Sequence, residues 1–140
     1  RTKRIVQDLS RAATGIIIDN IQNIICRQLK SRRQIEITLA LKKLLSEDSH
    51  INRRPSYYAQ LLHISPVYLN EVVKNITGTT ASKYIQDEII LRAKRMLIYT
   101  TLSIKEIAFN LGFDDHTYFT RLFTQTAGLS PTTYRKKYLE

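Results

Sequence analysis

The chain has 140 residues, 43% of them hydrophobic, which is enough for one compact domain with an additional arm. Only four glycines and three prolines interrupt it, so the composition favours helices over a turn-rich β fold. No apolar run approaches the roughly 18 residues of a membrane-spanning helix, and the net charge of +10 suits an anionic partner such as nucleic acid.

Little in the sequence predicts an enzyme. Cys26 is the only cysteine, which rules out an intramolecular disulfide and a cysteine-based zinc site, and we expect it to be a small buried apolar residue. His50, His63 and His116 are not spaced as metal ligands. With no glycine-rich phosphate loop and no Ser/His/Asp arrangement, we expect no catalytic site, no metal and no cofactor.

Residues 1–33 are expected to form a helical arm. Their apolar residues recur at helical spacing, although Gly15 interrupts the pattern and residues 15–19 also fit a short strand. A stripe of this length must be buried, either against the rest of the chain or, in our hypothesis, in a dimerisation or sensor-linking helix. Residues 1–54 carry 12 Lys and Arg against 5 Asp and Glu, whereas residues 55–140 carry 10 against 7, so most of the excess charge lies near the arm.

A first pair of short helices is predicted over residues 55–78. Pro55 opens a helix that reaches Leu62, because proline is tolerated in the first helical turn. After a turn, Ser65 is a good N-cap for the next helix, which Gly78 ends in the manner of a C-terminal glycine. The expected buried stripe of this next helix consists of Leu69, Val72, Val73 and Ile76.

A longer connecting helix is expected over residues 82–100, which contain neither glycine nor proline. Its apolar stripe is made up of Ile85, Ile89, Ala93, Met96 and Leu97. At about 1.5 Å per residue this helix spans roughly 28 Å, close to the roughly 34 Å between successive major grooves on one face of DNA. Its length therefore fits the separation of two DNA-reading elements.

A second pair of short helices is predicted over residues 103–127. Ser103 opens the first of them with a capping-box pattern. Asp114 or Asp115 caps the second helix, and Gly128 stops it. The expected buried stripe of this second helix consists of Phe119, Leu122 and Phe123.

The second pair repeats the first. Ala59-x-x-Leu62 matches Ala108-x-x-Leu111 at an offset of 49, and the following residues match at an offset of 50. Two short helices joined by a tight turn, the second with a capped start, form a helix-turn-helix motif. Either copy alone also fits an ordinary helical hairpin, but two copies favour two helix-turn-helix units.

Particular residues in these segments match a known pattern. The second pair and its flank contain Ile107-Ala108-x-x-Leu111-Gly112-Phe113, then Tyr118-Phe119 with Phe123 four residues later, and Gly128-x-Ser130-Pro131-x-x-Tyr134-Arg135. The earlier segments contain Tyr58-Ala59-x-x-Leu62, Ile64-Ser65-Pro66-x-Tyr68-Leu69, Lys74, Gly78 and Ala93-Lys94-Arg95-Met96-Leu97. Over roughly residues 34–138 the chain closely resembles the AraC/XylS family of bacterial transcription regulators.

The resemblance implies an all-α fold of seven helices, in which two helix-turn-helix subdomains are joined by a long connecting helix. It places a DNA-binding domain at residues 34–140, preceded by the N-terminal helical arm of residues 1–33. Members commonly carry a separate sensor or dimerisation domain, and we expect one upstream of this sequence in the intact protein.

The resemblance and the exposed faces of the recognition helices together identify candidate base-reading residues. They are Val67, Asn70, Glu71 and Lys74 in the first unit, and His116, Thr117, Thr120 and Arg121 in the second. Arg121 suits bidentate pairing with guanine, Asn70 similar pairing with adenine, and Val67 contact with a thymine methyl group. Glu71 stands where some members have arginine; it either accepts from cytosine or is a surface residue paired with Lys74.

Contacts to the DNA backbone are expected where helix N-termini present free N–H groups and where cations lie nearby. The candidate phosphate ligands are Ser65, Tyr68, Ser103, Lys105, Thr124 and Arg135. Lys83 and Arg92 are further cations, for which a solvated surface role is an equal alternative. The Arg32–Arg33 and Arg53–Arg54 pairs either flank linkers or contact phosphate. Arg135 alternatively locks the last helix through an internal ion pair.

We predict a sequence-specific DNA-binding transcription regulator that places two recognition helices in adjacent major grooves. The expected partners are double-stranded promoter DNA, RNA polymerase if the protein is an activator, and a second copy bound through the arm. The expected location is the cytoplasm, at the nucleoid. Two alternatives remain: a helical protein-interaction module, supported only by Glu71 and the modest charge of residues 55–140, and a nonspecific architectural DNA binder.

Overall fold

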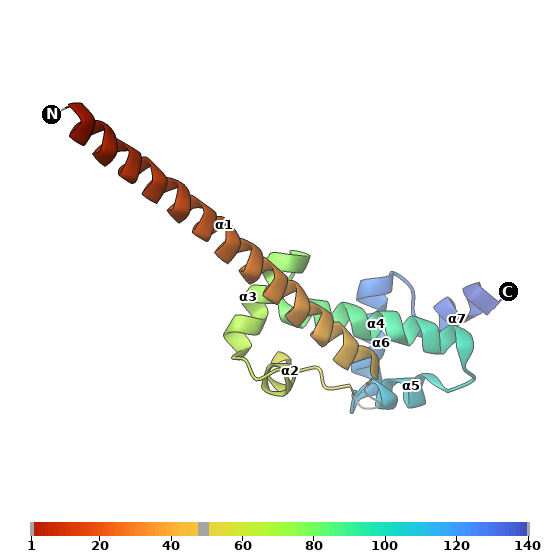
Figure 1. The fold of residues 1–140 in the computed structure, drawn as a ribbon. Helices are drawn as coiled ribbons and strands as arrows, with labels where there is room; N and C mark the ends of the chain where they lie inside the picture. The colour runs from red at the N-terminus through yellow and green to blue at the C-terminus, as the bar shows by residue number, and fades with distance from the viewer. Residues whose placement is uncertain (1, 48–50, 140) are drawn as a thin grey trace. The chain divides into compact units, whose positions relative to one another are not determined.

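The computed structural model describes residues 2–47 and 51–139, and every regular element in that part of the chain is a helix (Figure 1). The helices are α1 (Thr2–Glu47), α2 (Pro55–Leu61), α3 (Pro66–Thr77), α4 (Ala81–Tyr99), α5 (Ile104–Asn110), α6 (His116–Ala127) and α7 (Pro131–Leu139). This confirms the predicted all-α class, while His50 lies outside the described residues. The chain divides into two compact parts, one ending at Glu36 and one beginning at Ile37.

The N-terminal part of the chain consists of α1 as far as Glu36. The helix continues through Gly15, so the alternative of a strand over residues 15–19 is wrong. A glycine costs only about 1 kcal/mol in a helix interior, so a single glycine does not interrupt a helix of this length. Cys26 is exposed, and the prediction that it is buried is also wrong, because a solitary helix provides no second layer to cover it.

The C-terminal part of the chain, from Ile37 onward, is organised around α4. This helix contacts both members of the first helix pair, α2 and α3, and also α5, α6 and α7. It buries Ile85, Ile89, Ile90, Ala93 and Leu97, which include most of the predicted stripe, whereas Met96 is half-buried. Both helix-turn-helix units therefore share one connecting helix as the centre of their core.

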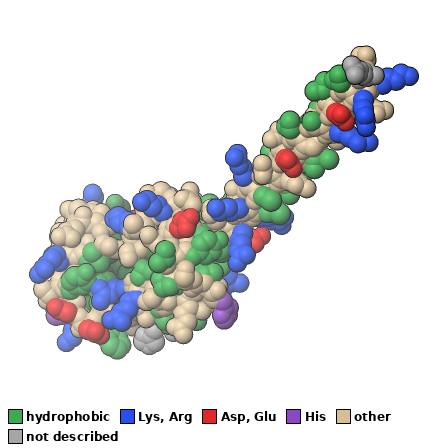
Figure 2. All heavy atoms as spheres, turned by 90° about the vertical axis from the view of Figure 1, so that its left-hand side faces the viewer, with side chains coloured by type: hydrophobic (Ala, Val, Ile, Leu, Met, Phe, Trp, Pro, Cys, Tyr) green, Lys and Arg blue, Asp and Glu red, His purple; other side chains and the backbone are tan. Residues whose placement is uncertain are grey.

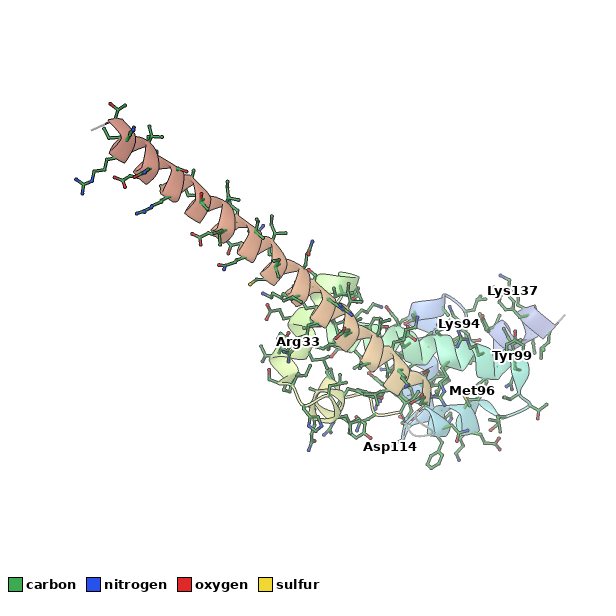
Figure 3. All side chains as sticks on the ribbon, in the orientation of Figure 1. Arg33, Lys94, Met96, Tyr99, Asp114 and Lys137 are labelled. Atoms are coloured by element: carbon green, nitrogen blue, oxygen red, sulfur yellow. The ribbon has the colours of Figure 1, made fainter. Side chains whose placement is uncertain are left out.

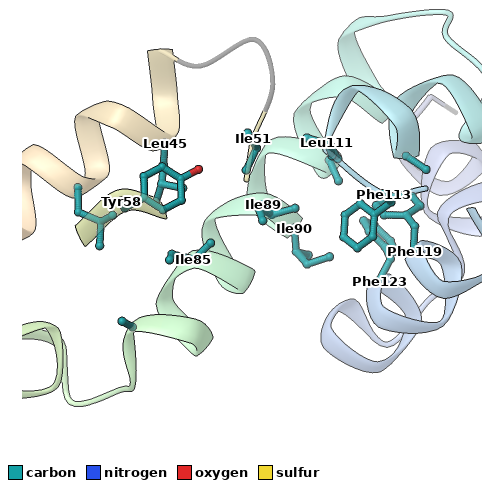
Figure 4. Close-up of a cluster of buried hydrophobic side chains, with 14 of the residues drawn as sticks. Leu45, Ile51, Tyr58, Ile85, Ile89, Ile90, Leu111, Phe113, Phe119 and Phe123 are labelled. Atoms are coloured by element: carbon teal, nitrogen blue, oxygen red, sulfur yellow. The ribbon is translucent and has the colours of Figure 1, made fainter. Parts of the chain in front are cut away.

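The two sides of this core differ in composition. On the first side Tyr58 and Leu45 pack near α4, and on the second side Phe113, Phe119 and Phe123 form an aromatic group (Figure 4). The ring centroid of Phe119 lies 5.2 Å from that of Phe113 and 6.0 Å from that of Phe123. Large aromatic side chains contribute more buried area per residue than aliphatic ones, so the second side of the core rests on few residues.

The helix ends agree with the predicted caps. The Ser65 side chain accepts from the Tyr68 amide at 3.1 Å, and Asp115 accepts from the Thr117 amide at 2.9 Å. Ser103 and Glu106 form the predicted capping box. Gly78 and Gly128 both end their helices with φ near +80°, the left-handed conformation that glycine adopts without strain.

Two residues expected in the buried stripes are less buried than predicted. Ile76 in α3 is 39% exposed, and Leu122 in α6 is half-buried against the core rather than within it. Periodicity identifies the face of a helix that points inward, but it does not say where along the helix the covering layer ends.

No helix in the described chain combines the length and the apolar character needed to cross a membrane.

The turns of the two helix-turn-helix units use different residues at equivalent positions. His63 adopts φ +57° in the first turn, and Gly112, 49 residues later, adopts φ +83° in the second. A Cβ atom at Gly112 would lie 2.2 Å from the carbonyl oxygen of Ile51, whose side chain is buried. The second turn thus requires glycine for both its conformation and its close backbone contact, whereas the first turn tolerates a side chain.

We expect Gly112→Ala and His63→Gly to change stability in opposite directions. Gly112→Ala should lower the free energy of unfolding by more than about 2 kcal/mol, because it adds backbone strain and a steric clash. His63→Gly should leave it unchanged or raise it by up to about 1 kcal/mol, because it removes the left-handed strain of a side chain. Urea unfolding followed by circular dichroism measures both, and equal losses would contradict this account of the two turns.

Candidate nucleic-acid interface

The recognition helix of the first unit, α3, presents a polar outer face. Leu69, Val72 and Val73 are completely buried, as predicted. The opposite side carries the predicted base-reading residues Val67, Asn70, Glu71 and Lys74, all of them exposed. Val67 is 79% exposed, so an apolar side chain is held in water at the point where a base edge would meet it.

Asn70 also has a contact that the sequence did not predict. Its Oδ1 atom accepts a hydrogen bond from the Ala81 amide at 2.9 Å. Ala81 begins α4, where the first amides have no partner within the helix. Asn70 therefore joins the recognition helix to the connecting helix through its side-chain oxygen. Its side-chain nitrogen remains available as a hydrogen-bond donor.

Glu71 does not form the ion pair that the sequence suggested as an alternative. The ion pairs among the described residues are Arg32–Glu36, Lys43–Glu47 and Lys83–Asp87. All join exposed residues four apart on one helix, and none lies on a recognition helix. Glu71 and Lys74 are thus both available to a ligand.

The recognition helix of the second unit, α6, offers a longer polar face. His116, Thr117 and Arg121 are exposed, while Thr120 is half-buried. The Thr120 hydroxyl donates to the His116 carbonyl at 2.9 Å, and the Thr124 hydroxyl donates to the Thr120 carbonyl at 2.6 Å. These threonines therefore present oxygen acceptors and methyl groups outward, whereas Arg121 keeps its full set of donors.

Four of the predicted phosphate ligands lie at the start of α3 or of α5. Lys105 is exposed on α5, and Ser65 and Tyr68 lie at the start of α3, where the free amides of a helix N-terminus suit an anion. Ser103 is exposed as well, although its side chain already takes part in the capping box. Phosphate contact by all of these residues stays a prediction.

Arg135 has internal partners. Its Nε donates to the Leu97 carbonyl at 2.9 Å, and one Nη donates to the Thr100 carbonyl at 3.4 Å. The last carbonyls of a helix lack partners within it, so Arg135 satisfies the end of α4 and attaches α7 to it. The alternative role of locking the last helix is supported, with backbone carbonyls in place of the expected ion pair.

Two tyrosines around α4 hold their protons more tightly than usual. Burial raises the pKa of Tyr84, and the nearby Glu88 carboxylate raises it further. Burial, and to a smaller extent Tyr138, raises the pKa of Tyr134, whose ring packs edge-on against Phe123 at 5.5 Å. Both hydroxyls are therefore neutral at physiological pH and contribute packing instead of charge.

Charge is spread over the surface. On the face drawn in Figure 2, Lys and Arg side chains alternate with hydrophobic and acidic ones. Asp114 lies in the turn before α6, and Lys94 and Lys137 lie on α4 and α7 (Figure 3). Among the described residues no group of three or more His, Cys, Asp or Glu side chains is placed to hold a metal ion.

Comparison with known proteins identifies relatives. Residues 58–137, more than half of the chain, match the model of a helix-turn-helix domain family. The HTH-type transcriptional regulator YfiF of Bacillus subtilis is 37% identical over 103 residues, which cover 74% of this chain and 31% of the relative. The arabinose operon regulatory protein of Salmonella typhimurium is 33% identical over 88 residues, covering 63% of this chain and 31% of that protein.

A solved structure shows the same arrangement. The C-terminal domain of AraT, a response regulator from Geobacillus stearothermophilus, superimposes with a TM-score of 0.65 at 29% identity. The match covers 72% of this chain and 84% of that domain. This chain therefore spans about a third of the length of the curated relatives but most of the solved C-terminal domain.

The hydrogen bond between Asn70 and Ala81 separates a folding role from a reading role. We expect Asn70→Ala to lower the free energy of unfolding by about 1 kcal/mol, because it leaves a helix-start amide without its acceptor. Asn70→Asp should keep most of the stability, since a carboxylate oxygen still accepts from Ala81, although it removes the side-chain amide donor. Urea unfolding measures the stability of both variants, and equal stability of the two would show that the bond is unimportant.

Proposed function

The chain belongs to the AraC-type helix-turn-helix family, and we propose that it is the DNA-binding part of a transcription regulator that reads a specific promoter sequence. The observation that carries the proposal is Arg121, an exposed arginine on the polar face of α6 that forms no ion pair with a described residue. Its planar guanidinium matches the O6 and N7 atoms of guanine in the major groove. The family model and the relatives support the class of function, because the model describes a helix-turn-helix domain and the relative YfiF is named an HTH-type transcriptional regulator.

Both recognition helices are proposed to engage one DNA duplex. They are joined through α4, whose 19 residues span roughly 28 Å, a length suited to helices placed in successive major grooves. The polar faces of α3 and α6 favour this interpretation over a protein-interaction module, which would be expected to present an apolar surface there. The second unit is the stronger reader, since Val67 and Glu71 give the first unit fewer donors.

Regulation requires more than DNA contact. The promoter is the proposed site of action, so the protein would work on the chromosome in the cytoplasm. If it activates transcription, it must also contact RNA polymerase, through a surface outside the recognition helices. Phe109, which is 66% exposed on α5, is an apolar side chain available for such a contact.

We expect Arg121→Ala to relax the preference for one base pair and to weaken specific binding by about 1–3 kcal/mol. Arg121→Lys should retain affinity for nonspecific DNA but lose the same base preference, because an ammonium group cannot pair bidentately with guanine. Binding to duplexes selected from a random library by the unmodified chain measures both effects. A uniform loss on all sequences would instead identify a nonspecific architectural binder.

The same library separates reading from simple charge. Arg95 is an exposed arginine on α4, so Arg95→Ala removes an equal charge outside the recognition helices. It should leave the selected sequence unchanged. If the unmodified chain itself binds duplexes with only a shallow dependence on salt, the protein-interaction module is favoured, because phosphate contacts give a steep dependence on salt.

The arm is proposed to join two copies of the protein. Residues 1–33 are assigned to it and residues 34–140 to the DNA-binding domain. Every described residue before Gln34 is exposed, including Ile5, Leu9 and Ile16, which are 60–65% exposed. Such a long apolar stripe on one helix is typical of a surface that a partner covers, and pairing with the same stripe of a second copy is the simplest symmetric solution.

We expect the 140-residue chain to dimerise at micromolar concentration, and the double substitution Ile17→Asp with Ile24→Asp to make it a monomer. These residues are seven apart and therefore share one face of α1. The pair Gln22→Asp and Asn23→Asp adds the same charge to polar positions and should leave the dimer intact. Sedimentation equilibrium measures all three proteins, and a monomeric unmodified chain would rule out the proposed arm contact.

A further inference from the structure

The segment between α1 and α2 contributes a cation to the second helix-turn-helix unit. Arg53 belongs to this segment by sequence, yet its guanidinium carbon lies 4.3 Å from the centroid of the Phe113 ring and 5.2 Å from that of the Tyr118 ring. Phe113 is 2% exposed and packs on Phe119 in the core. Two rings, one buried in the core and one partly exposed on the recognition helix, therefore hold the guanidinium.

The backbone of the segment is fixed as well. The carbonyl oxygen of Ile51 lies so close to Gly112 that a Cβ atom there would be 2.2 Å away. Ile51 itself is 4% exposed, which anchors the segment in the core two residues before Arg53. Arg53 is thus held from both sides, by its own backbone and by the rings under its guanidinium.

The donors of Arg53 remain free for a ligand. Stacking on a ring uses the flat face of a guanidinium, while its five N–H donors point outward around the edge. Within the described chain no carboxylate forms an ion pair with Arg53, and its side chain is exposed. A preorganised arginine with unused donors is the arrangement that proteins use to bind phosphate and carboxylate groups.

Arg53 lies where the first half of α4 meets the second recognition helix. It lines a cavity of about 200 Å³ together with Ser82 and Gln86 of α4 and with Tyr118 and Leu122 of α6. Ser82 follows Ala81, whose amide donates to Asn70 of α3, so the cavity extends from the flank of α6 toward the contact between α3 and α4. Tyr118 neighbours the base-reading Arg121 on the surface of α6, because the two are three residues apart.

DNA that receives α3 and α6 in successive major grooves must present the backbone between those grooves to the space between the helices. From this geometry we propose that Arg53, supported by the polar side chains of Ser82 and Gln86, binds a phosphodiester of that backbone. The site also offsets the carboxylates of Asp114 and Asp115, which precede α6 and repel phosphate. The inference rests on the proposed function, since it adds a contact to the same DNA complex.

The test compares Arg53→Ala with Arg54→Ala on a duplex selected from a random library by the unmodified chain. Arg54 is the neighbouring exposed arginine and stacks on neither ring, so its loss removes the same charge from nearly the same place. Arg53→Ala should weaken binding about tenfold and reduce the slope of log affinity against log salt by about 0.9. Arg54→Ala should change both much less.

Arg53→Lys tests the role of the rings. It keeps the charge, so the salt slope should be retained, but an ammonium group does not stack flat on two rings and affinity should fall part of the way. Equal effects of Arg53→Ala and Arg54→Ala, an unchanged salt slope in Arg53→Ala, or full affinity in Arg53→Lys would each overturn the proposal.

A second variant guards against loss of folding in Arg53→Ala. Gln86→Glu leaves both ring contacts in place and adds a negative charge to the opposite wall of the cavity, so it should also weaken binding and flatten the response to salt. Gln28→Glu adds the same charge to the arm and should have no effect. If Gln86→Glu matches Gln28→Glu while Arg121→Ala still relaxes the preference for one base pair, this inference fails and the proposed function stands. If Arg121→Ala also has no effect, the proposed function itself fails.

Discussion

Burial of α4 on several sides is the constraint on which the rest of the structure depends. Neither helix pair has enough apolar surface to form a core alone, because each consists of a helix of 7 residues and one of 12. Each pair instead packs against α4, which contributes Ile85, Ile89, Ile90, Ala93 and Leu97 to a continuous core. The spacing of the two recognition helices is therefore set by one rigid helix and not by a flexible linker.

The two units have the same backbone plan but different chemistry. Both have a capped recognition helix that ends in a left-handed glycine. The first unit places His63 in the turn where the second requires Gly112, because only the second turn lies against the carbonyl of Ile51. The repeated elements supply the fold, and the residues that differ between copies determine what each copy contacts.

Local signals explain what the sequence predicted well. Caps, glycine stops and apolar periodicity act over a few residues, so Ser65, Ser103 and Gly128 identified their helix ends correctly. The contacts of Asn70 with Ala81 and of Arg135 with Leu97 join residues 11 and 38 apart, and no local pattern marks them. Sequence also misjudged Cys26, since burial depends on what covers a helix and periodicity describes only the helix itself.

The segment that carries Ile51 and Arg53 makes further long-range contacts of this kind. It leaves α1, touches the turn and the recognition helix of the second unit, and only then enters α2 of the first. Arg53 therefore ties this segment to two aromatic rings of the second unit, while the backbone enters α2 of the first unit two residues later. The two helix-turn-helix units are thus joined at this segment as well as through α4.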